Sequence, residues 1–147
     1  MPSRRTTPNA NLYEKLCLAV LQSAEALTTD LGNFLKTYDL TPVQYNALRI
    51  LRGAGPDGAT CQTIAERLIT RDPDVTRLLD RLEHKQLVIR RREAMDRRVV
   101  KAILTPDGLD LVNRLDQPVQ AWHAERLGRL SPAECQSLLA LLERMRT

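Results

Sequence analysis

Hydrophobic positions spaced three and four residues apart predict long amphipathic helices at both ends of the chain. The first such helix covers residues 11–38. Two further helices follow in 106–147, the second opened by a capping box at Ser131 and Glu134. Pro118 should bend the first of these two, because proline removes one helical hydrogen bond. The apolar stripe of the first helix consists of Leu12, Leu16, Ala19, Val20, Ser23, Leu27, Leu31, Phe34 and Leu35.

Residues 41–105 change period several times within a short distance. Thr41, Thr60 and Asp72 are placed to cap three helices, and Pro42 and Pro73 suit the first helical positions. The second helix covers Cys61–Leu68, with Ile64, Ala65 and Leu68 facing inward. The third has a buried stripe of Val75, Leu78, Leu79 and Leu82. Residues 87–92 and 99–104 are extended, with a polar tip between them. A helix pair followed by a hairpin predicts a winged helix-turn-helix.

The predicted fold is therefore mainly α with a small β-hairpin wing. One domain covers residues 1–147, in which the winged helix-turn-helix (41–105) is flanked by N- and C-terminal dimerisation helices (11–38 and 106–147). The winged helix-turn-helix of residues 41–105 is called the reader below. The apolar stripes of the outer helices are larger than the surface needed to cover the core of the reader. We expect the outer helices to pack against each other and against a second copy. A monomeric helical core is the alternative.

Positive charge is concentrated in the predicted reader. The net charge of the whole chain is +4, and residues 71–101 alone hold ten Arg and Lys against six Asp and Glu. A local positive field on a neutral scaffold suits double-stranded DNA, with a solvated charged surface as the alternative. The segment Met1–Ala10, with Arg4 and Arg5, is expected to be a basic arm. Aromatic residues make up only 3%, which disfavours recognition by base stacking.

The candidate DNA contacts lie on the third helix of the reader and on the hairpin. Arg77 can contact a guanine edge with its guanidinium, while Asp74 can accept from cytosine or lie off the DNA. Arg81 could instead brace Glu83 or Asp80. At the hairpin tip, Asp96 is expected to hold Arg98 extended by a charge-assisted hydrogen bond. The predicted contact residues are Thr63, Arg71, Asp74, Thr76, Arg77, Arg81, Arg91, Arg92, Asp96, Arg97 and Arg98.

The segment from about Leu40 to Leu111 resembles the MarR family of winged-helix transcription regulators. The match is carried by 75–83, by Asp96-Arg97-Arg98, and by 104–108, which reads Leu-Thr-Pro-Asp-Gly. The resemblance implies homodimers that bind pseudo-palindromic operators and repress nearby genes, with Arg98 in the minor groove and Asp96 positioning it. The chain departs from the family at Gln86 and Ile69, where glycine is common. A left-handed backbone at Gln86 would cost about 1 kcal/mol.

The resemblance also implies a signal that changes the spacing of the two readers. A small aromatic or amphipathic effector is expected between the reader and the dimerisation helices, where the lining residues would be Tyr13, Tyr38, Tyr45, Trp122 and His123. Cys17 offers a thiol-based, peroxide-sensing alternative. Its neighbour one turn on is Leu21, so its environment is apolar and favours a core-filling role.

Other classes of protein are disfavoured by the sequence. His84 and His123 are the available neutral-pH bases, and neither belongs to a catalytic motif. The chain carries no Gly-rich phosphate loop, zinc-ligand spacing or nucleophile elbow, so we expect neither an enzyme nor a cofactor. Three widely spaced cysteines and the lack of a long apolar run predict a cytoplasmic protein without a membrane span. A non-specific architectural DNA-binding protein is a further alternative, but its basic residues would be spread more widely.

Overall fold

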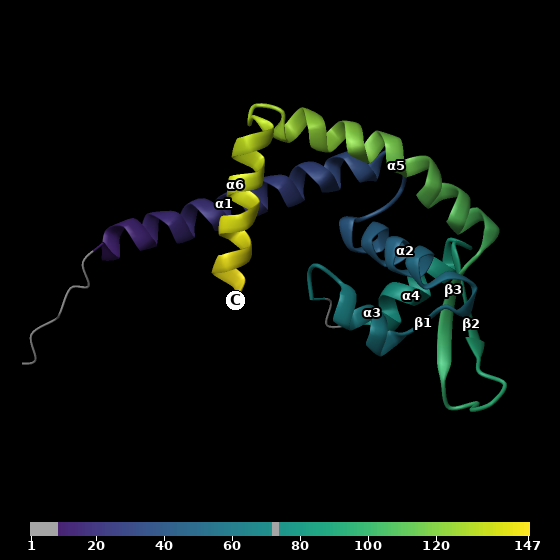
Figure 1. Cartoon of the computed structure of the whole chain (residues 1–147). Helices are drawn as coiled ribbons and strands as arrows, with labels where there is room; N and C mark the ends of the chain where they lie inside the picture. Colours follow the sequence, from purple (N-terminus) through teal and green to yellow (C-terminus); the bar gives the residue numbers. More distant parts are fainter. Residues whose placement is uncertain (1–8, 72–73) are drawn as a thin grey trace, which may run out of the picture.

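A computed structural model describes residues 9–71 and 74–147 of the chain (Figure 1). Asp72, Pro73 and the first eight positions of the expected basic arm lie outside the described residues. The helices are α1 (Ala10–Lys36), α2 (Pro42–Ala54), α3 (Cys61–Arg67), α4 (Val75–His84), α5 (Pro106–Leu127) and α6 (Pro132–Arg146), with a 3₁₀ turn at Gly55–Asp57. The strands are β1 (Ala59–Thr60), β2 (Val88–Arg92) and β3 (Val100–Leu104).

Side-chain caps begin most of the helices where the sequence predicted them. At α2, the Thr41 hydroxyl accepts from the Gln44 amide at 3.2 Å, and the Gln44 side chain accepts from the Thr41 amide at 3.1 Å. Ser131 and Glu134 form the same reciprocal pair at α6, and Thr60 and Thr105 cap α3 and α5. Each cap satisfies amides that the first helical turn leaves without a partner.

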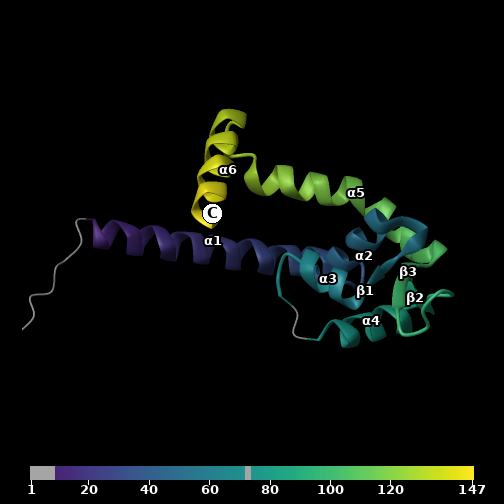
Figure 2. The same ribbon diagram turned by 60° about the horizontal axis from the view of Figure 1, so that its bottom comes forward.

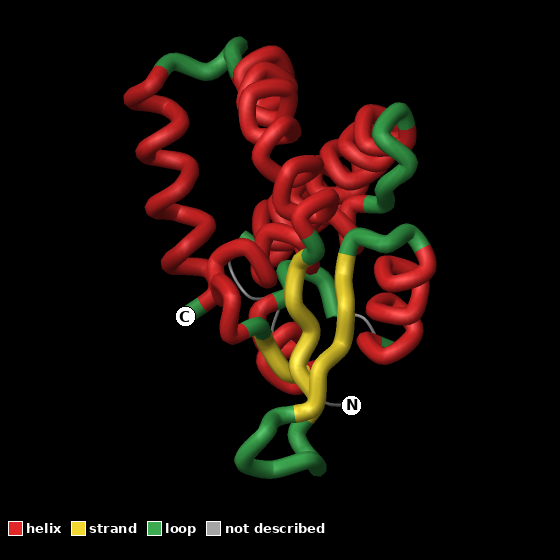
Figure 3. The backbone as a smooth tube through the Cα atoms, turned by 90° about the vertical axis from the view of Figure 1, so that its right-hand side faces the viewer, coloured by secondary structure: helices red, strands yellow, loops and turns green. Residues whose placement is uncertain are grey.

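The hairpin belongs to a three-stranded antiparallel sheet in the order β1-β3-β2 (Figure 3). Strand β2 pairs with β3 so that Arg91 lies opposite Lys101, while Ala59 of β1 lies opposite Ala102. The sequence did not predict β1, which has only two residues. Gly58 precedes it with φ 71°, and a Cβ there would collide with the Ala102 carbonyl. Glycine is therefore required where β1 meets β3.

The hydrophobic core lies within the reader and beneath the adjoining ends of α1 and α5. Leu48, Leu82 and Val88 have no exposed surface, and Leu35 of α1 and Leu115 of α5 are equally buried beside them. Ala65 of α3 is exposed, so the prediction that it faces inward is wrong. The core is thus formed by close packing between several short elements. This packing fixes the position of α4 relative to the hairpin.

The outer helices extend away from this core (Figures 1 and 2). Helix α5 continues through Pro118, and α6 crosses back from its far end. Helix α1 buries only Leu35, and α6 buries no residue. The large hydrophobic side chains that are exposed on these two helices are Leu12, Tyr13, Leu16, Leu18, Leu21, Leu27, Leu138, Leu139, Leu141 and Met145. Within the described part of the chain, no helix is long and apolar enough to cross a membrane.

Candidate nucleic-acid interface and adjoining cleft

Helix α4 presents one buried and one exposed face. Val75, Leu78, Leu79 and Leu82 pack into the core, which leaves the Thr76, Arg77 and Arg81 side chains in solvent. The cap of this helix is Asp74, whose Oδ1 accepts from the Arg77 amide at 2.9 Å. The prediction that Asp72 is the cap is therefore wrong, because α4 begins at Val75. Asp74 has a structural role at the helix N-terminus, where a carboxylate also complements the helix dipole.

Two further predicted contacts lie before α4. Arg71 is exposed in the segment that leads into the helix. Thr63 is half-buried on α3, where its hydroxyl accepts from the Thr60 hydroxyl at 3.0 Å and its amide donates to the same oxygen at 3.1 Å. Thr63 thus contributes to the N-terminal turn of α3, and Arg71 extends the basic surface of α4.

The hairpin tip is ordered by local hydrogen bonds. The Arg98 amide donates to Asp96 Oδ1 at 3.0 Å, and the Arg92 guanidinium donates to the Arg97 carbonyl at 2.8 Å. Asp96 therefore holds the Arg98 backbone, and the predicted bond to its side chain is not formed. The side chains of Arg91, Arg97 and Arg98 are exposed. A rigid backbone that carries free-standing arginines lowers the entropy lost when a hairpin enters a groove.

Arg90 joins the hairpin to α4. Its guanidinium donates to Asp80 and, at 2.7 Å, to Glu83. The hydrogen bonds to Asp80 and then Glu83 raise the pKa of Arg90 above its ordinary value, so the bridge stays charged. The sequence offered Arg81 as a partner of Asp80 or Glu83 only as an alternative to a DNA contact, and Arg90 takes that place. Strand alternation could have identified Arg90, because it faces the side opposite to Arg91.

A cleft of about 360 Å³ lies between the reader and the outer helices. Its walls come from α1, α2, α5 and the segment that follows α3. Tyr45, Trp122 and His123 line it, as the sequence predicted. The other lining residues are Leu27, Thr28, Leu31, Pro42, Val43, Asn46, Arg49, Ile69, Thr70, Val119 and Leu127.

The cleft combines apolar walls with a few polar groups. Trp122 is 7% exposed, and its indole Nε1 has no hydrogen-bond partner among the described residues. The Arg49 guanidinium lies 6.0 Å from the centre of the Tyr45 ring, and His123 meets the Trp122 ring edge-on at 5.1 Å. Burial raises the pKa of Tyr45, which keeps its phenol neutral. Apolar walls with a nearby cation suit an aromatic ligand that carries an acidic group.

Other residues predicted for the effector or the redox site lie elsewhere. Tyr13 is 59% exposed near the start of α1, and Tyr38 packs on Phe34 with ring centres 5.6 Å apart. Neither lines the cleft. Cys17 is exposed on α1, so the expected core-filling role is wrong for the single chain. The described residues contain no cluster of His, Cys, Asp and Glu that could hold a metal ion.

Sequence reasoning missed the cleft residues that come from α2 and the helix-turn-helix turn. The Asn46 side chain accepts from the Ile69 amide at 2.9 Å, and both residues line the cleft together with Arg49. Ile69 does not have a positive φ, so the absence of glycine there causes no strain. Arg49 lies one helical turn after Tyr45 on α2, so spacing from Tyr45 could have found Arg49, and Asn46 is three residues before Arg49.

Comparison with known proteins agrees with this geometry. The MarR family model matches residues 40–100. A MarR transcription factor from Planctomyces limnophilus is 36% identical, with 88% of this chain and 94% of that chain covered and a TM-score of 0.70. The S. aureus MepR-DNA complex gives 27% identity, coverage of 88% and 94%, and a TM-score of 0.78. The homoprotocatechuate degradative operon repressor of Escherichia coli is 28% identical over 132 residues, with 90% and 88% covered.

These relatives match the reader and the outer helices together, since each alignment covers most of both chains. The relatives thus share the whole arrangement, in which long helices flank a winged helix-turn-helix. The chain belongs to the MarR family of transcriptional regulators.

Proposed function

We propose that the chain is a homodimeric repressor that binds a pseudo-palindromic operator in double-stranded DNA. Helix α4 lies in the major groove, where Thr76, Arg77 and Arg81 contact bases or phosphates. The hairpin reaches the adjacent minor groove with Arg98. The observation that carries the proposal is the Arg90 brace, which joins both elements into one basic surface with exposed arginines at both ends.

The unburied faces of α1 and α6 support the homodimer. Leu12 and Leu16 are 60% and 55% exposed on α1, and Leu138 and Leu141 are 45% and 58% exposed on α6. Apolar surface of this extent on two helices is typical of a face that another chain covers. A second copy would bury these helices and hold two readers at a fixed separation, as a two-fold symmetric operator requires.

The cleft supports regulation by a small aromatic effector. It is large enough for a single-ring molecule, and Arg49 could bind a carboxylate on that ring. One relative is named for control of homoprotocatechuate degradation, and homoprotocatechuate is an aromatic acid of this kind. Since the helix-turn-helix turn forms part of the wall, an occupied cleft would displace the reader and weaken operator binding.

A gel-shift titration tests this function. The DNA is the intergenic duplex upstream of the chain's own gene, with random duplex as competitor at fixed salt. We expect nanomolar, specific binding that is weakened by homoprotocatechuate or a related aromatic acid. Equal affinity for random duplex would contradict the proposal and favour an architectural protein. Peroxide should leave the affinity unchanged; loss of binding that depends on Cys17 would instead support thiol sensing.

A further inference from the structure

The C-terminal ends of α1 and α4 have the same backbone design. At the end of α1, the Leu40 amide donates to the Leu35 carbonyl at 3.2 Å, and Asp39 has φ 57°. At the end of α4, the Leu87 amide donates to the Leu82 carbonyl at 3.0 Å, and Gln86 has φ 60°. Each helix is closed by a left-handed residue other than glycine, so both ends have defined shapes.

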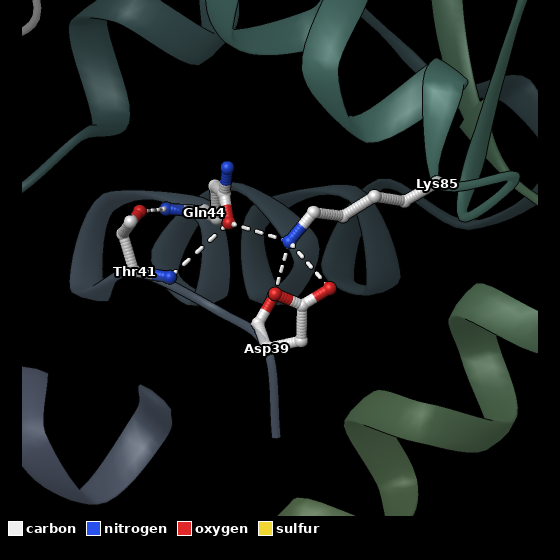
Figure 4. Close-up of polar contacts among 4 residues, drawn as sticks. All are labelled: Asp39, Thr41, Gln44 and Lys85. Atoms are coloured by element: carbon white, nitrogen blue, oxygen red, sulfur yellow. Dashed lines mark hydrogen bonds and ion pairs between the residues drawn. The ribbon is translucent and has the colours of Figure 1, made fainter. Parts of the chain in front are cut away.

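Lys85 connects these two ends (Figure 4). Its Nζ donates to the Asp39 carbonyl and lies 3.3 Å from Asp39 Oδ2 and 3.5 Å from Gln44 Oε1. Gln44 is itself fixed, because it completes the capping box with Thr41. The side chain of Lys85 is 26% exposed. One ammonium group therefore joins the C-cap residue of α4 to the junction between α1 and α2.

The Lys85 contact links an outer helix to the helix that carries the candidate DNA contacts. Helix α1 is part of the outer arm, whereas α4 carries the exposed Arg77 and Arg81. The ion pair of Arg52 with Asp116, at 2.8 Å, ties α5 to α2 but does not reach α4. Lys85 acts on α4 directly. Its ammonium also lies at the C-terminal end of α1, where the helix dipole favours a cation.

We propose that Lys85 is a positioning residue that fixes the direction of α4 relative to α1. In the dimer, this direction sets the distance and rotation between the two recognition helices. Lys85 thereby restricts the half-site separation that the protein accepts. The consequence for operator spacing rests on the proposed function. The effect of Lys85 on the angle of α4 is expected in the free protein as well.

The first test compares operators in which the half-site separation is changed by one or two base pairs. Each added base pair rotates one half-site by about a tenth of a turn. We expect the wild type to lose about tenfold or more in affinity at one added base pair, and Lys85→Met to lose about threefold or less. A Lys85→Met profile parallel to that of the wild type would overturn the proposal, even if its affinity were lower throughout.

Two variants serve as controls. Lys36→Met removes an exposed charge from the last turn of α1 without touching the contact, so the wild-type spacing profile should remain. Asp39→Gly removes the carboxylate but keeps the carbonyl that accepts from Lys85, and it suits the left-handed backbone. It should also keep the spacing profile. A flattened profile in Lys36→Met would contradict the assignment to Lys85.

A second test needs no operator. Nitroxide labels at Arg77→Cys, in a chain whose Cys17, Cys61 and Cys135 are replaced by serine, report the distance between the two recognition helices. We expect one narrow distance distribution with Lys85 and a broad one with Lys85→Met, while Lys85→Arg restores the narrow form. An unchanged distribution would overturn the proposal. If the wild type is a dimer but binds no operator, the DNA-binding part of the proposed function fails, yet this distribution still decides the role of Lys85.

Discussion

The reader and the outer helices α1 and α6, called the arms below, differ in how much of their apolar surface is buried. In the reader, side chains such as Leu48 and Leu79 are fully buried, and polar groups brace the surface through Arg90 and Lys85. On the arms, α6 buries nothing and Leu16 and Leu141 remain more than half exposed. One half of the fold is thus complete within a single chain, whereas the apolar faces of α1 and α6 are left uncovered by the described residues.

Breaking the arms should have the largest effect on DNA binding. Replacing Leu12 and Leu16 with glutamate places charges on the exposed face of α1 and should separate the chains. A monomer loses the second half-site contact, so operator affinity should fall by about 100-fold to 1,000-fold. Sedimentation velocity and gel shift measure the two consequences. Leu109→Glu, at a leucine near the reader that is 43% exposed, is the control and should stay dimeric. A dimeric double variant would refute this role of α1.

Breaking the core of the reader should lower the stability of the fold itself. Leu48→Ala creates a cavity at a fully buried position and should cost about 2–5 kcal/mol in the free energy of unfolding. Urea denaturation, followed by circular dichroism, measures this loss. Leu18→Ala on α1 removes the same atoms from a side chain that is 50% exposed and should cost far less. Equal losses at the two sites would erase the distinction between reader and arm.

Removing one exposed arginine from the hairpin should leave the stability unchanged and weaken only DNA binding. Arg98→Ala should reduce operator affinity by about 1–3 kcal/mol if Arg98 contacts the minor groove. Arg91→Ala should act through phosphate charge, with a smaller loss and a flatter salt dependence. Fluorescence anisotropy at several salt concentrations separates the two effects. Normal binding by Arg98→Ala would show that the wing does not read the groove.

The smallest expected effect is a gain in stability of the reader at Gln86. Gln86 has φ 60°, a conformation in which glycine avoids the Cβ penalty. Gln86→Gly should therefore stabilise the reader by up to about 1 kcal/mol, measured as a rise in the thermal midpoint. Gln62→Gly in the first turn of α3, where φ is helical, is the control and should destabilise. A lower midpoint in Gln86→Gly would mean that the Gln86 side chain has a stabilising contact that outweighs the strain.

Local chemistry explains why much of the reader could be predicted from the sequence. The caps at Thr41, Thr60, Thr105 and Ser131 need only residues three positions apart, and all four are formed. The β-hairpin follows from β-branched runs around a polar tip. Strand β1 escaped prediction because two residues carry no periodicity, and its pairing depends on Ala102, far along the chain.

Long-range placement explains the errors at the site. The choice between Arg81 and Arg90 as partner of Asp80 and Glu83 depends on how β2 packs against α4, which residue type alone does not reveal. The choice of Asp74 over Asp72 as cap is decided by where α4 begins. The cleft residues Asn46 and Ile69 come together only after α2 and the turn before α4 have packed. Tyr13 and Tyr38 were assigned to the cleft from their residue type, and the fold directs them elsewhere.

The most direct test of the difference between reader and arms is the mass and affinity of the DNA complex. Analytical ultracentrifugation would compare a duplex with two half-sites and a duplex of equal length with one intact half-site. We predict that two chains bind the two-site duplex together, and that the one-site duplex is bound at least about 100-fold more weakly. A single chain that bound either duplex with equal affinity would contradict the claim that the arms are completed by a second copy.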